Sequence, residues 1–398
     1  MRPRSLRLNL SLLTVVVVSM VALSVSASAA RVFHVAPEPR GSATGASADD
    51  AASYRDTGVW ATVKEHIGGE PVTVRFAAGD YVQGPLTVKG VGGPNHTLTV
   101  EGDSDGGTVF QALNEDETKP NTGFYLVDCR NIVVRDLHFT GPGKTGYISR
   151  ATGQHILFER CSWIDLPNIR YGAAGSTGKE TSHIVYRNCT FRRVGLQGGA
   201  HMIYNAYEPG HIYVIDCTFE DCAGDYVRWR DLTDCSLARG CSFKSTGTWP
   251  PEKPVHASFI SVPLFVDADP GDEWFGTHFL IQNNVFDYDQ SELPGSAAPI
   301  RFSHSGYDPP GLHHLMTPEE GAILERGTPE ERKALLKRNC NIDTNEVRVF
   351  GNTYHNVSTK ATFSSRAAYG AESKGWEGTV DIFELFNHAA GTPEWVKD

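Results

Sequence analysis

Two neighbouring segments of the chain hold most of the side chains that could do chemistry. Residues 198–206 read G-G-A-H-M-I-Y-N-A, and residues 224–231 read G-D-Y-V-R-W-R-D. Arginine binds carboxylate and sulfate groups through paired hydrogen bonds, while histidine and tyrosine can transfer protons. Because the whole chain carries a net charge of −11, this concentration of arginine, histidine and tyrosine indicates a local site for an acidic ligand.

A repeated pattern shows how these segments must be positioned. The motif I-x-V-x-x-C-x-F recurs with steps of 24 or 28 residues in its regular part, and with longer steps of 43 and 68 where insertions intervene. Repeats of this length are typical of arrays whose units bury their apolar faces only by stacking. The residues at the Cys position are Leu137, Cys161, Cys189, Cys217, Cys241, Asn284 and Asn352, and the aromatic residues two positions later are Phe139, Trp163, Phe191, Phe219, Phe243, Phe286 and Tyr354.

Each repeat predicts a bent unit rather than a hairpin. Apolar residues five and three positions before the Cys alternate with polar ones, as in a strand with one buried face. The residue just before the Cys mostly tolerates a tight corner, as Asp136, Asn188 and Gly240 do. A second strand follows this corner, so stacked units would form a parallel solenoid with interior ladders of Cys or Asn and of aromatic residues.

These units resemble the coils of a right-handed parallel β-helix, and the chain is similar to the pectate-lyase-like superfamily over residues 70–362. The resemblance implies an all-β solenoid with an N-terminal helical cap and a short helical insertion. Many polysaccharide lyases with this fold commonly use Lys or Arg as the base, whereas neither of the two segments contains a Lys. Fold alone does not fix function, so the reaction must be inferred from the site residues.

The repeat also serves as a ruler for the two segments. Tyr204 and Arg228 both lie 13 residues before their reference Cys, so we expect them side by side on one outer face. His201 and Asp225 both lie 16 residues before it and should stack in the same two coils. Similar dipeptides of an apolar and a polar residue extend this column in both directions. The predicted column is Arg170, Tyr204, Arg228, Ile260 and Arg301, and Arg230 joins it.

The reaction that this column favours is β-elimination from a uronate polymer. A cation neutralises the carboxylate beside the labile C–H, a base removes that proton, and an acid assists the leaving oxygen. The arginines would neutralise the carboxylate, and His201 or Tyr204 would transfer the proton. The catalytic candidates are therefore His201, Tyr204 and Arg228, and the candidates for substrate binding are Arg170, Asp225, Arg230, Arg301 and His304.

Other interpretations of the same residues stay open. Glycoside hydrolysis needs two carboxyl groups that flank the scissile bond, and Asp225 with Asp231 or Asp234 could supply them. The solenoid could also bind carbohydrate without cleaving it. Alternatively, the arginines pair with these aspartates as a solvated surface, and His201 has a purely structural role.

The segments outside the repeat have patterns of their own. Residues 1–30 read as a secretory signal peptide, with three arginines, an apolar run and an Ala-Ser-Ala cleavage site. Residues 31–69 predict a strand and a capping helix over residues 59–67. Within residues 309–345, Thr-Pro-Glu-Glu occurs twice and predicts two short helices. Residues 363–398 are predicted to cap the far end.

The net charge and the predicted export of the chain limit its expected partners. Removal of residues 1–30, whose only charged residues are three arginines, would change the net charge from −11 to −14. Such an acidic protein is a poor general binder of nucleic acid or anionic membrane, so we expect neither as a partner. We expect a secreted or periplasmic monomer whose partner is an acidic polysaccharide.

The eight cysteines of an exported chain would first suggest disulfides. However, four of them share the interior column, which favours free thiols packed as small apolar groups. Cys222 and Cys235 fall outside that column and could pair. No spacing indicates a zinc site. As a cofactor we consider only Ca²⁺, for which the acidic loop 267–273 offers carboxylates, although a solvated loop is the simpler interpretation.

Overall fold

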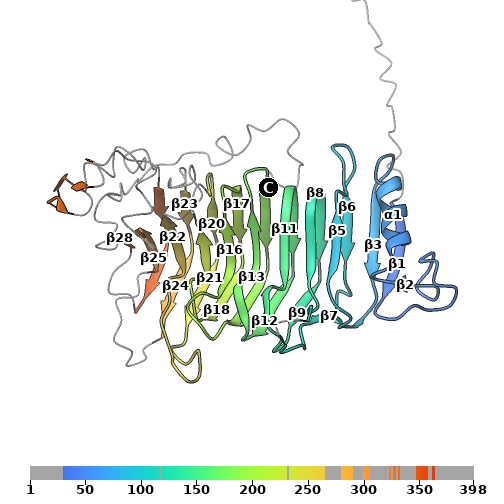
Figure 1. Ribbon diagram of the computed structural model, residues 1–398, viewed down its shortest axis with the longest axis horizontal. Helices are drawn as coiled ribbons and strands as arrows, with labels where there is room; N and C mark the ends of the chain where they lie inside the picture. Colours follow the sequence, from blue (N-terminus) through green and yellow to red (C-terminus); the bar gives the residue numbers. More distant parts are fainter. Residues whose placement is uncertain are drawn as a thin grey trace, which may run out of the picture.

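The strands of the protein stack in parallel, coil upon coil, along one long axis (Figure 1). The computed structural model describes residues 30–116, 119–230, 233–264, 279–289, 299–304, 347–356 and 361–363, together with a few residues between 319 and 331. Neighbouring coils pair in register, as between β14 (Ser182–Arg187) and β17 (Gly210–Ile215). The fold is a right-handed parallel β-helix, which confirms the expectation from the repeat.

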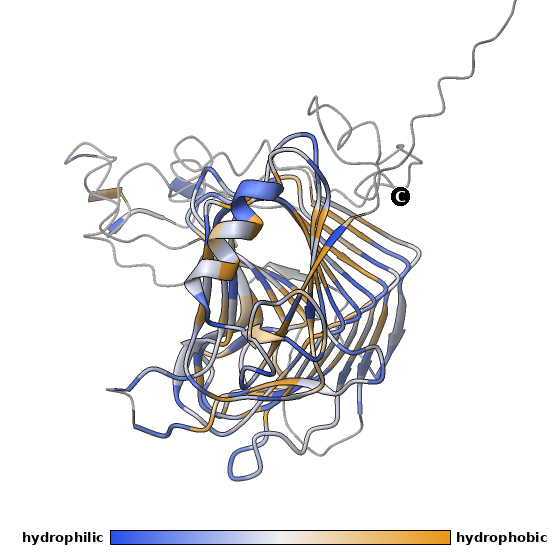
Figure 2. Cartoon of the chain, turned by 90° about the vertical axis from the view of Figure 1, so that its right-hand side faces the viewer, coloured by the Kyte–Doolittle hydropathy of each residue, from blue (hydrophilic) through white to orange (hydrophobic). Residues whose placement is uncertain are grey.

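Each coil passes through three faces, and Figure 2 looks along the stack. The first face contains β5 (Leu86–Lys89), β10 (Thr145–Tyr147), β13 (Ile169–Thr177), β16 (His201–Ala206), β19 (Val227–Trp229), β22 (Ile260–Leu264), β25 (Ile300–His304) and β28 (Ala361–Phe363). The second face contains β2 (Ala52–Ser53), β1 (Arg31–Ala36), β3 (Val72–Phe76), β6 (Leu98–Glu101), β14, β17, β20 (Leu237–Arg239), β23 (Phe279–Gln282) and β26 (Val347–Phe350). Two long strands, β8 (Phe124–Arg135) and β11 (Ser149–Glu159), run from the first face into the second.

The third face is a separate sheet of shorter strands. These are β4 (Gly79–Tyr81), β7 (Thr108–Gln111), β9 (His138–Thr140), β12 (Ser162–Leu166), β15 (Thr190–Val194), β18 (Thr218–Cys222), β21 (Ser242–Ser245), β24 (Val285–Tyr288) and β27 (Thr353–His355).

The corner between the second and third faces lies where the repeat predicts it. In all seven repeats the residue just before the reference position has a positive φ, between 51° and 67°. This left-handed conformation redirects the chain within one residue, and Gly, Asn and Asp adopt it at lower cost than other residues. The seven corner residues are Asp136, Arg160, Asn188, Asp216, Gly240, Asn283 and Gly351.

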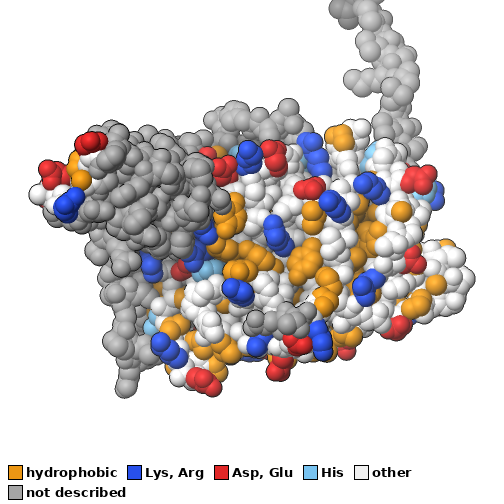
Figure 3. Space-filling view, viewed as in Figure 1, with side chains coloured by type: hydrophobic (Ala, Val, Ile, Leu, Met, Phe, Trp, Pro, Cys, Tyr) orange, Lys and Arg blue, Asp and Glu red, His pale blue; other side chains and the backbone are white. Residues whose placement is uncertain are grey.

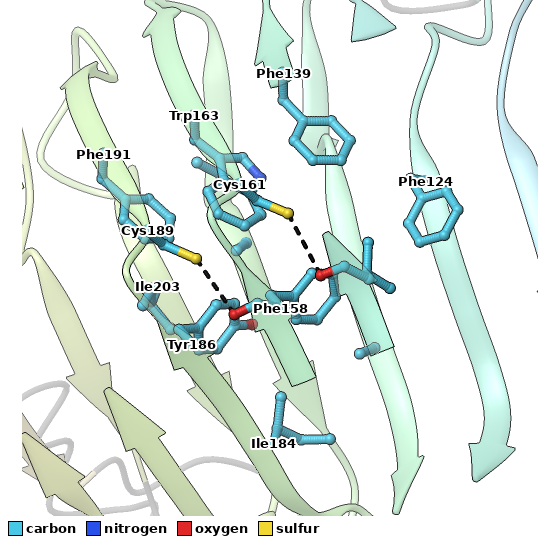
Figure 4. Packing of buried hydrophobic residues seen from close by; sticks show 14 of the residues in the cluster. Phe124, Phe139, Phe158, Cys161, Trp163, Ile184, Tyr186, Cys189, Phe191 and Ile203 are labelled. Carbon is cyan, nitrogen blue, oxygen red and sulfur yellow. Dashed lines mark hydrogen bonds between the residues drawn. The ribbon is translucent and has the colours of Figure 1, made fainter. Parts of the chain in front are cut away.

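The two predicted interior ladders are present. Trp163 stacks on Phe191 with ring centroids 4.5 Å apart (Figure 4). Similar contacts continue along the aromatic column to Tyr354. The thiol of Cys189 donates to the Phe158 carbonyl at 3.4 Å, also drawn in Figure 4. Burial raises the pKa of this thiol well above its usual value, so it packs as a neutral, nearly apolar group.

At its C-terminal end the Cys ladder becomes an amide ladder. The Asn284 side chain is buried, accepts a hydrogen bond from the Cys241 amide at 2.9 Å and donates to the Asn352 side chain at 3.0 Å. It also donates to the Ala238 carbonyl at 3.0 Å. Asn284 therefore bonds to the coils on either side of it, because the in-register stacking brings the same position of every coil together.

One helix, α1 (Thr57–His66), lies at the N-terminal end of the stack (Figures 1 and 2). Asp56 caps it, and the Asp56 carboxylate accepts from the Gly58 amide at 2.7 Å. Val59 and Val63 are buried in the main core, so the helix covers apolar side chains of the first coils. The predicted capping helix is therefore present and begins two residues earlier than expected.

The second face has an unusual outer surface. Outward-facing Leu157, Val185 and Tyr213 align in consecutive coils, and each is at most 3% exposed. Two residues earlier in the same strands lie His155, His183 and His211. The rings of His155 and His183 are tilted with centroids 4.7 Å apart, and those of His183 and His211 stack with centroids 4.3 Å apart. The three histidines share a positive φ, so they mark a second set of corners that the sequence analysis did not identify.

Several expectations for the cysteines and the ends can be compared with the structure. The proposed pairing of Cys222 with Cys235 is wrong, because both are free; Cys222 is instead buried in the core and donates to the Ala200 carbonyl.

One of the two predicted helix starts is confirmed by its cap, in which the Glu331 carboxylate accepts from the Thr328 amide at 2.7 Å. The signal peptide, the loop 267–273 and residues 364–398 lie outside the described residues. No helix in the described part of the chain is long and apolar enough to cross a membrane.

Candidate functional site

The candidate site lies on the first face, where β13, β16, β19 and β22 run side by side. Tyr204 of β16 pairs with Arg228 of β19, and Ile203 pairs with Val227 in the next register position. Ile203 and Val227 are fully buried in the core, whereas Tyr204 and Arg228 face outward and are partly exposed. The predicted register of the two segments is therefore confirmed.

Two members of the predicted column are misplaced. The residue of β13 that pairs with Tyr204 is Gly175, not Arg170, and the residue of β22 that pairs with Arg228 is Ser261, not Ile260. Ile260 pairs with Val227 and is buried. The prediction was wrong because apolar-polar pairs of similar type recur within a strand, and variable loops between coils shift which pair is in register.

Arg301 is correctly placed in this column. Arg301 belongs to β25 and pairs with Ser261 of β22, and its side chain is exposed. The first-face column therefore reads Gly175, Tyr204, Arg228, Ser261 and Arg301 in consecutive coils. This arrangement leaves two guanidinium groups on one outer surface of an acidic protein.

His201 lies beneath this column, in contact with Arg228. Its Nε2 is 2.7 Å from Nη1 of Arg228, and since a guanidinium can only donate, Nε2 is the acceptor. Oδ2 of Asp225 is 3.5 Å from the same Nη1 and 3.8 Å from Nδ1 of His201, so the predicted neighbourhood of His201 and Asp225 is present. Burial and the Arg228 cation lower the pKa of His201 well below its usual value. The neutral imidazole therefore holds Arg228 in place.

Tyr204 is held between two arginines. Nη1 of Arg230 donates to the Tyr204 hydroxyl at 3.1 Å, and the guanidinium carbon of Arg228 is 5.5 Å from the centre of the Tyr204 ring. The His201 ring packs against the same tyrosine, with centroids 5.2 Å apart. Arg230 is itself only 8% exposed, so its position is fixed by its surroundings. Because the Tyr204 oxygen accepts from Arg230, its own proton stays available for donation.

This geometry separates the roles of the candidate residues. Arg228 and Arg230 are anchored by His201, Asp225 and Tyr204, so they can present positive charge to an acidic group without rearrangement. The Nε2 lone pair of His201 already accepts from Arg228, which leaves Tyr204 as the better placed group for proton transfer. In this arrangement His201 orients the guanidinium group of Arg228.

The remaining predicted residues lie further from this cluster. Arg170 is exposed at the start of β13, with its guanidinium carbon 5.2 Å from the ring centre of Tyr171. His304 ends β25, where it pairs with Leu264 of β22, and its side chain lies outside the described residues. Asp234 follows β19 whereas Asp225 precedes it, so these two aspartates belong to opposite ends of that strand. Asp231 also lies outside the described part of the chain.

The sequence analysis missed two tyrosines beside the site. Tyr147 of β10 stacks on Tyr204 with ring centroids 6.3 Å apart, and Tyr171 lies 5.9 Å from Tyr147. Each has a glycine as an immediate chain neighbour, Gly146 and Gly172 respectively. A tyrosine beside a glycine in successive coils is the signal that could have identified them, because glycine leaves room for a ring to lie along the sheet.

No metal centre is evident in the described residues. They contain no group of three or more His, Cys, Asp or Glu side chains that could hold a metal ion. The acidic loop 267–273, considered above for Ca²⁺, is not among them. The candidate site contains arginine, tyrosine, histidine and aspartate side chains. On the side of the molecule drawn in Figure 3, Lys and Arg spread over the middle, while Asp and Glu lie mostly toward the upper and lower edges.

Comparison with known structures finds similarities at low sequence identity. A pectate lyase, Pel9A, is 13% identical, with a TM-score of 0.49, over 88% of this chain and 80% of its own. An alginate lyase from Paenibacillus sp. strain FPU-7 is 12% identical, with a TM-score of 0.45, over 83% and 98%. The A-module of the mannuronan C-5 epimerase AlgE4 from Azotobacter vinelandii is 10% identical, with a TM-score of 0.34, over 77% and 92%.

The sequence itself matches no family profile and no curated protein. At these identities, and with TM-scores below 0.5, the structural similarities assign neither a family nor an activity to this chain. The reaction and the substrate are therefore inferred from the side chains of the site.

Proposed function

We propose that this protein binds an acidic, uronate-containing polysaccharide on its first face and cleaves it by β-elimination. The observation that supports this proposal best is the arrangement of Arg228 and Arg230 around Tyr204, with His201 fixing Arg228 from below. Residues 1–30 would direct the protein out of the cytoplasm, and such polymers occur outside it.

The proposed reaction uses the two arginines as charge neutralisers. Their guanidinium groups bind the uronate carboxylate and stabilise the negative charge that develops on it when the adjacent carbon loses its proton. The bond from the neighbouring carbon to the leaving glycosidic oxygen then breaks, and a carbon-carbon double bond forms. The Tyr204 hydroxyl passes its proton to that oxygen and its own oxygen accepts the proton that leaves the carbon, so the hydroxyl is regenerated and the protons balance.

A hydrolase would need a pair of carboxyl groups flanking the bond. Asp225 is engaged by Arg228 at 3.5 Å, and Asp234 lies beyond the other end of β19. These positions give the hydrolase less support than the arginine and tyrosine cluster gives the lyase. The experiment below therefore also distinguishes hydrolysis from elimination.

The deciding experiment incubates the full chain with polygalacturonate, alginate and hyaluronate and follows ultraviolet absorbance of the unsaturated ends. We expect absorbance with at least one polymer, and a loss of turnover of about 100-fold or more in Arg228→Ala, because one transition-state donor is removed. Lys244→Ala removes a cation from the third face and should keep wild-type turnover.

Two results would contradict this proposal. New reducing ends without ultraviolet absorbance would show a hydrolase. Binding without any cleavage, with the same affinity in Arg228→Ala, would show that the cluster serves neither reaction.

A further inference from the structure

A row of tyrosine rings extends from the candidate site toward the N-terminal coils. Tyr204 stacks on Tyr147 with an interplanar angle of 14°, and Tyr147 contacts Tyr171 with ring centroids 5.9 Å apart. Tyr171 is 42% exposed, which is high for a large aromatic side chain of a sheet. The three rings thus form a continuous aromatic strip, of which the proposed elimination chemistry uses only Tyr204.

Glycines make room for this strip on the sheet. A Cβ at Gly172 or Gly175 would lie 3.1 or 2.9 Å from Cε1 of Tyr147, and one at Gly146 would lie 3.1 Å from the Tyr171 ring. The Tyr147 ring therefore lies directly on the backbone of β13 and reaches across it to Tyr204 in the next coil. A Cβ at Gly175 would also lie 2.2 Å from the Tyr204 carbonyl oxygen, so this glycine admits both the Tyr147 ring and the next coil.

Two further cations accompany the strip. The guanidinium carbon of Arg150 is 5.9 Å from the centre of the Tyr147 ring, and that of Arg170 is 5.2 Å from the centre of the Tyr171 ring. Neither arginine forms an ion pair with a carboxylate of the described residues, whereas Arg135, Arg160, Arg187 and Arg193 elsewhere all do. Arg150 and Arg170 thus keep their charge available to an incoming anion.

We infer that Tyr147, Tyr171, Arg150 and Arg170 form a subsite for a second uronate ring of the polymer, next to the cleavage site. The C–H-bearing face of a pyranose is apolar and slightly positive, so it packs on the negative face of an aromatic ring. The carboxylate of the same sugar is bound by a guanidinium beside that ring. This subsite rests on the proposed function, and it extends the polymer from Arg228 toward the N-terminal coils.

The test measures binding and catalysis separately in the full chain. Retardation in gels that contain polygalacturonate, alginate or hyaluronate gives the Kd, and ultraviolet absorbance gives kcat and KM. In Tyr171→Ala we expect Kd and KM to rise about 5- to 10-fold, with kcat within about 2-fold of wild type. Tyr171→Phe should restore both, because it retains the ring face.

Matched variants isolate each component of the subsite. Arg170→Ala should weaken binding to acidic polymers and leave binding to neutral hydroxyethylcellulose unchanged. The control variants Lys244→Ala and Val285→Ala, on the third face, should bind both kinds of polymer as the wild type does. Because Tyr171 and Arg170 are exposed, the unfolding midpoint of these variants should stay unchanged, which excludes a folding defect.

The outcomes distinguish this subsite from the proposed reaction. If no polymer is cleaved but Tyr171→Ala still weakens binding to an acidic polymer, the subsite stands and the lyase does not. If cleavage proceeds with unchanged Kd and KM in Tyr171→Ala, the subsite is overturned while the lyase stands. It is also overturned if the wild-type chain binds no acidic polymer, or binds the neutral polymer equally well.

Discussion

At the scale of single residues, the site is organised by the partners of its polar groups. Arg228 donates to the Nε2 of a buried, neutral His201, and Arg230 donates to the hydroxyl of Tyr204. Both cations are therefore oriented before a ligand arrives, so less side-chain entropy is lost on binding. The pKa of His201, lowered by burial and by Arg228, keeps this imidazole an acceptor throughout the neutral range.

This arrangement predicts a difference between two substitutions of His201. His201→Gln keeps a neutral acceptor near Nη1 of Arg228, whereas His201→Leu removes it. We expect His201→Leu to lose about 10- to 100-fold in kcat with a smaller change in KM, and His201→Gln to lose clearly less. Steady-state kinetics on the polymer cleaved by the wild type measures both. Equal losses in the two variants would show that His201 does not act through Arg228.

At the scale of the elements, the positive-φ corners define the coil. The residue before each reference position turns the chain from the second face to the third, and it does so in the left-handed region in all seven repeats. Strand pairing in the adjacent coils then depends on where that turn falls, because a shift of one residue would reverse which side chains face the core.

The corner at Asn188 allows a direct test of this dependence. Asn188 is exposed with a φ of 53°, so its substitution changes the backbone preference more than the packing. We expect Asn188→Val to lower the free energy of unfolding by about 1–2 kcal/mol, and Asn188→Gly to leave it nearly unchanged. Denaturant unfolding of both variants measures the difference. Wild-type stability in Asn188→Val would mean that the corner tolerates a β-branched residue.

At the scale of the whole molecule, the histidine stack on the second face links stability to pH. Burial and then Arg130 lower the pKa of His155 to about 4, and burial and then His211 lower that of His183 to about 3. The unfolded chain takes up these protons near pH 6.5, whereas the folded chain resists them until pH 3 to 4. The stack therefore stabilises the fold at neutral pH, and this contribution is lost as the pH falls below 6.5.

A comparison of pH profiles isolates the stack from the carboxylates that also titrate in acid. His183→Asn retains a side chain that tolerates the φ of 56° at this position and removes one titrating ring. We expect its free energy of unfolding to fall less steeply than that of the wild type between pH 6.5 and 4, as followed by thermal unfolding. Parallel profiles for His183→Asn and wild type would refute the linkage.

The sequence by itself determined the β-helix, its corners, its two ladders and the pairing of Tyr204 with Arg228. The corners and ladders recur in all seven repeats, and stacking places equal positions of regular coils on top of one another, so counting residues locates them and the Tyr204 and Arg228 pair. Only the tertiary structure decided that Gly175 rather than Arg170 lies beside Tyr204, that Ser261 rather than Ile260 lies beside Arg228, and that Tyr147 reaches across β13. The loops between coils vary in length and long side chains cross from one coil to another, so the repeat alone could not predict these contacts.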